Sequence, residues 1–272
     1  MNTFQGLRSW ALAAALICLA PAGHAATPSD QAVTPDQELA MGKEMFDNLK
    51  AKGEIIESSP LYDVLLPVIQ PIIKAAQPMY PHPFKVYLVH EAQPNAFATP
   101  GGYIYVVDGL LYFARNKEEL AGTLSHEVSH TIHRDGVELA KKRAEIQKRE
   151  IGGAIVLGPS AAHVLALALI GTLHSLTYSR EAESRADITG SDICAKAGIN
   201  PWGLVWLFRD FQNARTAEIP QLLSDHPNDQ NRIAALEQHF KHDPHTFGRF
   251  SPDTLSATRL NVPTKAPVVF LR

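Results

Sequence analysis

Helical spacing of apolar residues is clearest in residues 116–132. Asn116 with Glu119 three residues later has the pattern of an N-terminal capping box. The residues that follow place one apolar stripe along a single helix face. That stripe consists of Leu120, Leu124 and Val128. The pattern predicts a helix that buries this face in a core.

Other stretches also predict helices, so the chain is expected to be mainly helical. Thr34 with Gln37 predicts a capped helix that runs to about residue 50. An apolar stretch at residues 61–76 is helical in pattern but contains Pro67 and Pro71, which predict a kink or a break. Further helices are predicted at residues 141–150, from 179, from 200, and at 228–239.

Patterns typical of strands are confined to residues 84–107. Residues 84–90 are rich in Val and Tyr, and residues 95–98 and 103–107 flank a Thr-Pro-Gly-Gly turn, as in a hairpin. We therefore predict an α+β fold, mainly helical, with a small sheet or hairpin beside the 116–132 helix.

The first 25 residues have the pattern of a signal peptide. Arg8 precedes an uncharged stretch rich in Ala and Leu, which is short for a membrane span, and small residues end at Ala25. We predict an exported protein that begins near residue 26, with one domain at 26–245 and an irregular tail at 246–272.

Net charge and cysteine content further restrict the range of possible functions. The formal net charge of −3 gives no case for a nucleic-acid partner. One of the two cysteines lies in the predicted signal peptide, so the other, Cys194, has no partner for an intramolecular disulfide. Cys194 lies in a helical pattern and is predicted to be a small buried apolar residue.

The candidate chemistry lies within the 116–132 helix. His126 and His130 are four residues apart, so on a helix they share one face, one turn apart. Two imidazoles in that relation can hold one Zn²⁺, with Glu127 beside them as a general base. This short motif has only three fixed positions, so it does not identify a zinc site by itself. The presence of a third ligand must decide whether the site binds zinc.

The third ligand is expected on the helix that begins near Ser179. Glu183 and Asp187 share one face of it, so Glu183 can bind the metal while Asp187 accepts the free N–H of a zinc-bound histidine. Two histidines and one glutamate leave a fourth position for water, which is typical of catalytic sites. The metzincin pattern is excluded, because Gly136 stands where its third histidine is required.

Residues 151–173 contain no charge and are long enough for a membrane span. A single crossing there would place Glu183 and the two histidines on opposite sides of the membrane. We therefore expect this stretch to be buried or to fold back as a hairpin over the site. A span remains the alternative only if the zinc assignment fails.

Taken together, these features resemble the M48 zinc metallopeptidase family, which includes HtpX and the CAAX-prenyl peptidases, and in particular its secreted, BepA-like bacterial branch. The resemblance covers about residues 34–241. Members of this branch can carry a tetratricopeptide array, for which this chain is expected to have no room. It rests on Asn95-Ala96-Phe97 with Pro100-Gly101-Gly102-Tyr103, the 126–130 motif, Ser179-Arg180 with Glu183, Ala186 and Asp187, and His226-Pro227 with Arg232-Ile233.

The resemblance implies a zincin-like domain with one Zn²⁺ per chain. It implies that His126, His130 and Glu183 are the zinc ligands and that Glu127 is the catalytic base. His226 would either donate to the developing oxyanion or reach the open zinc position and hold the enzyme shut. The remaining site candidates are a substrate-side strand with its turn (Asn95, Ala96, Phe97, Gly101 and Gly102) and two residues that would stabilise the oxyanion or support the site (Tyr178 and Arg232).

We therefore expect a zinc metalloendopeptidase that cleaves unfolded or misfolded envelope proteins in a Gram-negative periplasm. The resemblance also suggests association with the outer membrane or its assembly components. The main rival is a chaperone-like peptide-binding protein whose zinc is structural or latched by His226. A weaker rival is a zinc hydrolase for small esters or amides.

Overall fold

The computed structural model describes residues 32–91, 93–150, 161–172, 176–213, 226, 230–264 and 267–271. The predicted signal peptide lies outside the described residues, as do residues 151–160 and 173 of the uncharged stretch. Within the described ranges, no helix combines the length and the apolar character that a membrane crossing requires.

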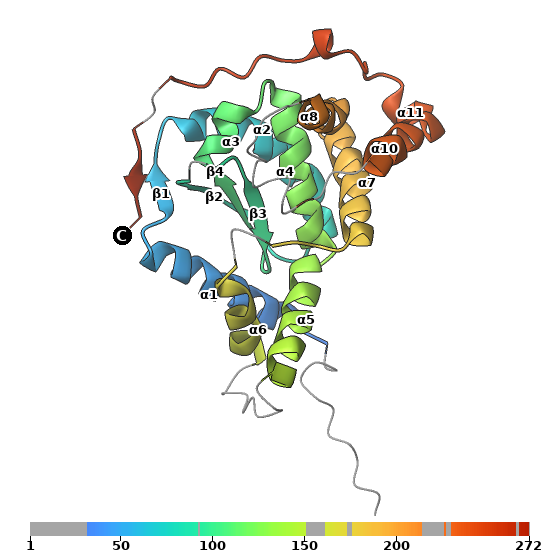
Figure 1. Ribbon diagram of the computed structural model, residues 1–272. Helices are drawn as coiled ribbons and strands as arrows, with labels where there is room; N and C mark the ends of the chain where they lie inside the picture. Colours follow the sequence, from blue (N-terminus) through green and yellow to red (C-terminus); the bar gives the residue numbers. More distant parts are fainter. Residues whose placement is uncertain are drawn as a thin grey trace, which may run out of the picture.

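One mixed sheet organises the domain (Figure 1). Its strands are β1 (Ile55–Ser58), β2 (Lys85–Val89), β3 (Ala96–Thr99), β4 (Tyr103–Val107) and β5 (Val269–Phe270), in the order β3-β4-β2-β1-β5. The predicted hairpin is confirmed, because β3 and β4 are antiparallel with Ala96 opposite Val106 and Thr99 opposite Tyr103. Strand β2 pairs with β4 in parallel.

Helices cover this sheet in two groups. Helix α4 (Lys117–Ile132) lies beside the sheet and packs against α2, α7 and α8, while α1, α5 and α6 gather at its lower end in Figure 1. The other helices are α1 (Pro35–Ala51), α2 (Leu61–Ala76), α3 (Asp108–Phe113), α5 (Asp135–Glu150), α6 (Ala161–Ile170), α7 (Arg180–Lys196), α8 (Trp202–Asn213), α10 (Gln230–His242) and α11 (Pro244–Phe247). The predicted fold, mainly helical with a small sheet, is confirmed.

The N-terminal caps predicted for α1 and α4 are present. Thr34 and Gln37 form the reciprocal capping box at α1. At α4 the Asn116 side chain accepts from the Glu119 backbone N–H at 2.8 Å. The Glu119 carboxylate, however, accepts from the Asn116 side-chain amide and from the Arg115 backbone N–H, at 2.6 and 2.9 Å, instead of from the Asn116 backbone.

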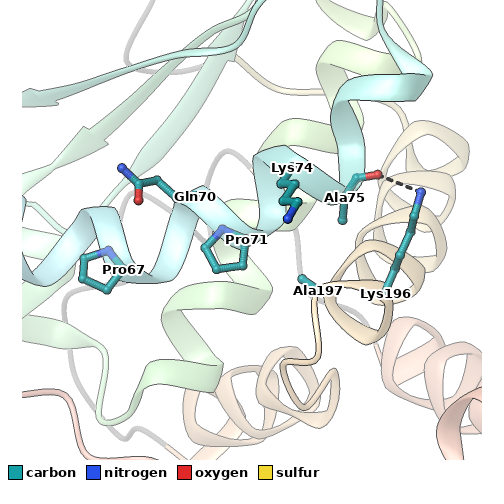
Figure 2. Close-up of a pocket in the computed structure, with 7 residues that line it drawn as sticks. All are labelled: Pro67, Gln70, Pro71, Lys74, Ala75, Lys196 and Ala197. Carbon is teal, nitrogen blue, oxygen red and sulfur yellow. Dashed lines mark hydrogen bonds between the residues drawn. The ribbon is translucent and has the colours of Figure 1, made fainter.

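Of the kink or break predicted for the second helix, the break does not occur, since α2 runs unbroken through Pro67 and Pro71. Both prolines line a surface pocket of about 610 Å³ between α2 and the end of α7 (Figure 2). Carbonyls that lose their N–H partner on this face can be hydrated, so the helix tolerates both prolines. Lys196 also donates to the carbonyl of Ala75 across this pocket, at 3.0 Å. None of the predicted site residues lines it.

Helix α4 is buried on every side rather than on one face. The predicted stripe residues are fully buried, but so are polar residues around the whole helix circumference. Several of these hydroxyls are satisfied by carbonyls of the same helix: Thr123 donates to Glu119, and Ser129 to Ser125. The helix that carries the candidate chemistry is therefore held in the centre of the domain.

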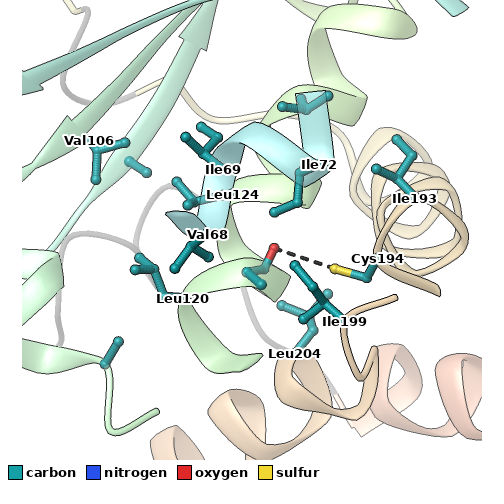
Figure 3. Close-up of a cluster of buried hydrophobic side chains, with 14 of the residues drawn as sticks. Val68, Ile69, Ile72, Val106, Leu120, Leu124, Ile193, Cys194, Ile199 and Leu204 are labelled. Carbon is teal, nitrogen blue, oxygen red and sulfur yellow. Dashed lines mark hydrogen bonds between the residues drawn. The ribbon is translucent and has the colours of Figure 1, made fainter. Parts of the chain in front are cut away.

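Packing between α2, α4 and α7 supplies much of the core (Figure 3). Ile69 and Ile72 of α2 and Leu124 of α4 belong to one apolar cluster with Cys194 of α7. The Cys194 thiol points to the carbonyl of Ala121 at 3.5 Å. Cys194 is fully buried, as predicted, and burial raises the pKa of its thiol to about 12.

The 246–272 segment is irregular over most of its described length, but it ends in β5, which pairs with β1. On the way it binds the first turn of α4, where the Glu118 carboxylate accepts from the backbone N–H and the hydroxyl of Thr258, at 2.8 and 2.7 Å. The segment therefore packs on the domain near its middle and again close to its end.

Candidate metal centre

Four side chains from three parts of the chain converge at the carboxyl-terminal half of α4. Ligand atoms of His126, His130, Glu183 and His226 all lie within 4.8 Å of one another. The Nε2 atoms of His126 and His130 are 3.0 Å apart. Nδ1 of His226 lies 2.9 Å from Oε1 of Glu183 and 3.2 Å from Nε2 of His126. The structure thus brings the three predicted ligands together and adds His226.

The donor set fits a divalent cation. Nδ1 of His126 lies 2.9 Å from the Asp187 carboxylate, and Nδ1 of His130 lies 2.8 Å from the Asp135 carboxylate. In the neutral ring form that metal binding requires, a carboxylate acceptor places the ring proton on Nδ1, so the two Nε2 lone pairs face each other. Two lone pairs cannot hydrogen-bond to each other, but they can both bind one metal ion. Two imidazoles and a carboxylate suit Zn²⁺.

Asp187 is held by Arg232 as well as facing His126. Nε and NH2 of Arg232 donate to the two Asp187 oxygens, both at 2.7 Å, and its NH1 lies 3.0 Å from Oε2 of Glu183. Burial raises the pKa of Asp187, but Arg232 outweighs burial and holds that pKa below its usual range. Arg232 therefore supports the carboxylates. Of the two roles predicted for Arg232, these contacts favour support of the site over stabilisation of the oxyanion.

Opposing effects also act on the pKa values of His126 and Glu183. Burial lowers the pKa of His126, but the Asp187 and Glu183 carboxylates outweigh it and raise that pKa to about 10. For Glu183, burial raises the pKa, whereas His226 and the two α4 histidines bring it well below its usual range. The cluster thus holds the Glu183 carboxylate in its charged form, which is the form that binds a metal ion.

Glu127 and Tyr178 border the cluster. Oε1 of Glu127 lies 3.3 Å from Nε2 of His226, and Glu127 is fully buried. The Tyr178 ring stacks on His130, with ring centroids 4.1 Å apart. Its hydroxyl is buried without a hydrogen-bond partner among the described residues, and burial, with Glu127, raises its pKa well above the usual value. Tyr178 therefore keeps a hydroxyl proton available for donation.

Residues 95–97 lie at and beside β3, which is an edge strand of the sheet. The side chains of Asn95, Ala96 and Phe97 are buried, and α4 packs against this strand. An edge strand can pair with an extended peptide through its backbone, independent of side-chain exposure. The substrate-side role of these three residues stays a prediction.

Gly101 and Gly102 form the β3–β4 turn, with φ of 82° and 84°. A Cβ at Gly102 would lie 2.7 Å from the carbonyl oxygen of Pro83, and one at Gly101 would lie 3.0 Å from Cα of Leu39. Both glycines are therefore required by the turn and its close packing on α1 and residue 83. Their predicted contact with substrate has no support in these neighbours.

Asp135 was not predicted from the sequence. It lies five residues after His130, beyond the end of α4, and so falls outside the helix periodicity that identified the other residues. The signal that could have found it is an acidic residue at the start of the next helix, directly after a short connection. Such a residue can fold back onto the last turn of the preceding helix.

The approach of α7 to α4 depends on Gly190. A Cβ there would lie 3.0 Å from N of His126 and 3.1 Å from C of Ser125, both backbone atoms that cannot move aside cheaply. We expect Gly190→Ala to lower the free energy of unfolding by about 1–3 kcal/mol, as overpacking does. Urea unfolding would measure this. Gly171→Ala, where nothing lies within 4 Å, is the control, and an equal effect of both changes would contradict the packing argument.

Sequence comparisons agree with this site. The profile described as Peptidase family M48 matches residues 64–239, which include the four clustered residues and Glu127. The chain belongs to peptidase family M48. Membership of this family supports the predicted metallopeptidase activity and is consistent with a zincin-like architecture.

Individual relatives are similar over part of their length. The chain is 26% identical over 218 residues to the beta-barrel assembly-enhancing protease of Yersinia pestis, which covers 76% of this chain and 45% of that protein. It is 27% identical over 157 residues to mitochondrial metalloendopeptidase OMA1 of Schizosaccharomyces pombe, covering 57% and 46% of the two proteins. To the protease HtpX homolog of Aquifex aeolicus it is 30% identical, covering 56% and 64%. The chain thus spans about half the length of the first two relatives.

Proposed function

We propose that this M48 chain is a zinc-dependent metalloendopeptidase. The observation that carries the proposal is the convergence of His126, His130 and Glu183 around one point, with Glu127 on the same helix as both histidines. Two imidazoles, one carboxylate and a neighbouring general base are the groups that peptide-bond hydrolysis at zinc requires.

Each side chain has a role in this chemistry. A bound zinc ion lowers the pKa of water and polarises a carbonyl group. Glu127 would accept the proton of the attacking water and then deliver it to the leaving amine. Tyr178, with its hydroxyl buried and its proton retained, would donate to the developing oxyanion. Asp187 and Arg232 would keep His126 and Glu183 oriented.

The edge position of β3 supports an extended, unfolded substrate. An extended peptide that added to this edge would be held by its backbone, so binding would depend little on its sequence. The relatives named as beta-barrel assembly-enhancing proteases motivate the substrate class: unfolded or misfolded envelope proteins in the periplasm, with the outer membrane or its assembly components as partners. A signal peptide at residues 1–25 remains part of this proposal.

A second function is favoured by the position of His226. Its Nδ1 belongs to the ligand cluster, and each of the four clustered side chains is at most 5% exposed. If His226 fills the position that water needs, the protein would bind peptides without cleaving them. His226 would then act as a latch instead of an oxyanion donor.

Metal dependence tests the proposed function directly. We expect the mature protein to cleave casein, to lose this activity in a chelator and to regain it with zinc. We expect Glu183→Ala to lose most of its bound zinc, measured by elemental analysis. Glu181→Ala is the matched control, because Glu181 is exposed on the same helix and lies outside the cluster. Full zinc content in Glu183→Ala would exclude this carboxylate as a ligand.

A further inference from the structure

The outer nitrogen of each α4 histidine meets a carboxylate, and each carboxylate meets an arginine. One set is His126, Asp187 and Arg232, and the other is His130, Asp135 and Arg185. The first carboxylate was expected from helix spacing, whereas the second was not. We propose, resting on the proposed function, that Asp135 is a positioning residue that orients His130 for metal binding, and that Arg185 holds Asp135 in place.

The chain reaches this geometry through a sharp turn between α4 and α5. Arg134 lies between the two helices with φ of 58°, the one non-glycine residue with positive φ among those the structure describes. This left-handed residue ends α4 and brings the next residue back toward the last turn. The Arg134 side chain is itself anchored, by Oε2 of Glu38 at 2.7 Å and the carbonyl of Val33 at 2.6 Å. The turn between α4 and α5 therefore fixes the position of Asp135.

Both oxygens of Asp135 have a defined partner. Oδ2 lies 2.8 Å from Nδ1 of His130, and Oδ1 accepts from NH2 of Arg185. Asp135 is also the first residue of α5, whose amino-terminal end favours a negative charge, and only 5% of it is exposed. A carboxylate held on three sides can keep the His130 ring from rotating. This ring orientation points Nε2 at the metal position.

The two arginines differ in exposure. Only 5% of the Arg232 side chain is exposed, compared with 47% of the Arg185 side chain. Arg185 lines an open pocket of about 680 Å³ between α7 and α10. Removing Arg185 therefore creates no buried cavity. Its loss can be used to test the orientation of His130 without threatening the fold.

Metal affinity is the decisive measurement, because it does not require peptidase activity. We expect Asp135→Ala to weaken zinc binding by about 10- to 100-fold, as loss of a carboxylate behind a metal-binding histidine does. Asp135→Asn should recover part of this loss, because its amide oxygen can still accept from Nδ1 of His130. Arg185→Ala should cause a smaller loss, of severalfold. Competition with a chelating dye would give the affinities, and the Co²⁺ spectrum would report the ligand geometry.

Arg209→Ala is the matched control. Arg209 is 44% exposed and pairs with Glu237 at 2.6 Å, on α8 and α10, outside the cluster. It should leave zinc affinity and the Co²⁺ spectrum unchanged. The proposal is overturned if Asp135→Ala and Arg185→Ala bind zinc within twofold of wild type, or if Arg209→Ala weakens binding equally. Failure of the wild type to bind zinc would instead overturn the proposed function, and this proposal with it.

Discussion

Glu127→Gln is expected to reduce cleavage of an unfolded protein such as casein by about 10²- to 10⁴-fold, the usual contribution of a general acid–base group. Glutamine keeps the shape of the side chain but cannot take up a proton at neutral pH. Glu127 is fully buried, with Oε1 3.3 Å from Nε2 of His226. Because Glu127 is not among the clustered ligands, zinc content should stay equal to that of wild type.

The comparison needs proteins of confirmed equal zinc content. Glu138→Gln is a suitable control, because Glu138 is an exposed residue of α5 that pairs with Lys141. Cleavage by wild type but not by Glu127→Gln would establish the peptidase and its base together. Cleavage by neither would favour the latched binding protein, and His226 would be changed next. Equal cleavage by both would exclude Glu127 as the base.

Arg232→Ala is expected to lower the free energy of unfolding by about 3–5 kcal/mol, which is typical when one partner of a buried ion pair is removed. Arg232 is 5% exposed, binds both oxygens of Asp187 at 2.7 Å and lies 3.0 Å from Glu183. Its removal would leave two buried carboxylates with less compensating charge. Urea unfolding of the metal-free protein would measure the effect without a contribution from bound metal.

Arg209→Ala serves as the control here as well. The Arg209–Glu237 pair is partly exposed, with 44% and 28% of the two side chains accessible. Screening by solvent limits such pairs to at most about 1 kcal/mol. If Arg232→Ala cost no more than Arg209→Ala, Arg232 would not be the structural support of the two carboxylates.

The features that the sequence left open or did not predict depend on interactions between distant segments. A kink or a break was expected at Pro67 and Pro71, and α2 continues through both without a break because they face an open pocket. Strand β1 has only four residues, whose burial does not alternate, and β5 has only two. Neither strand has a local sequence pattern that distinguishes it from the residues around it. Both form because a neighbouring strand satisfies their backbone groups.

Family resemblance supplied what spacing could not. Spacing placed Glu183 and Asp187 on one face of a helix, and the structure directs that face to α4. His226 has no periodicity to identify it, and only the resemblance singled it out. Arg232 was predicted to stabilise the oxyanion or to support the site, and its guanidinium contacts carboxylates. The direction of a long side chain depends on all the charges around it, which a sequence does not display.

The sequence by itself determined the local features of this M48 peptidase domain: the helix caps, the β3–β4 hairpin and the histidine face of α4. These depend on residues within a few positions of one another. Only the tertiary structure decided that α4 is enclosed on all sides, that His226 joins the ligand cluster and that Asp135 contacts His130. The physical reason is that these contacts require packing of α7, a left-handed turn and a loop residue against one helix, and no short sequence pattern encodes such packing.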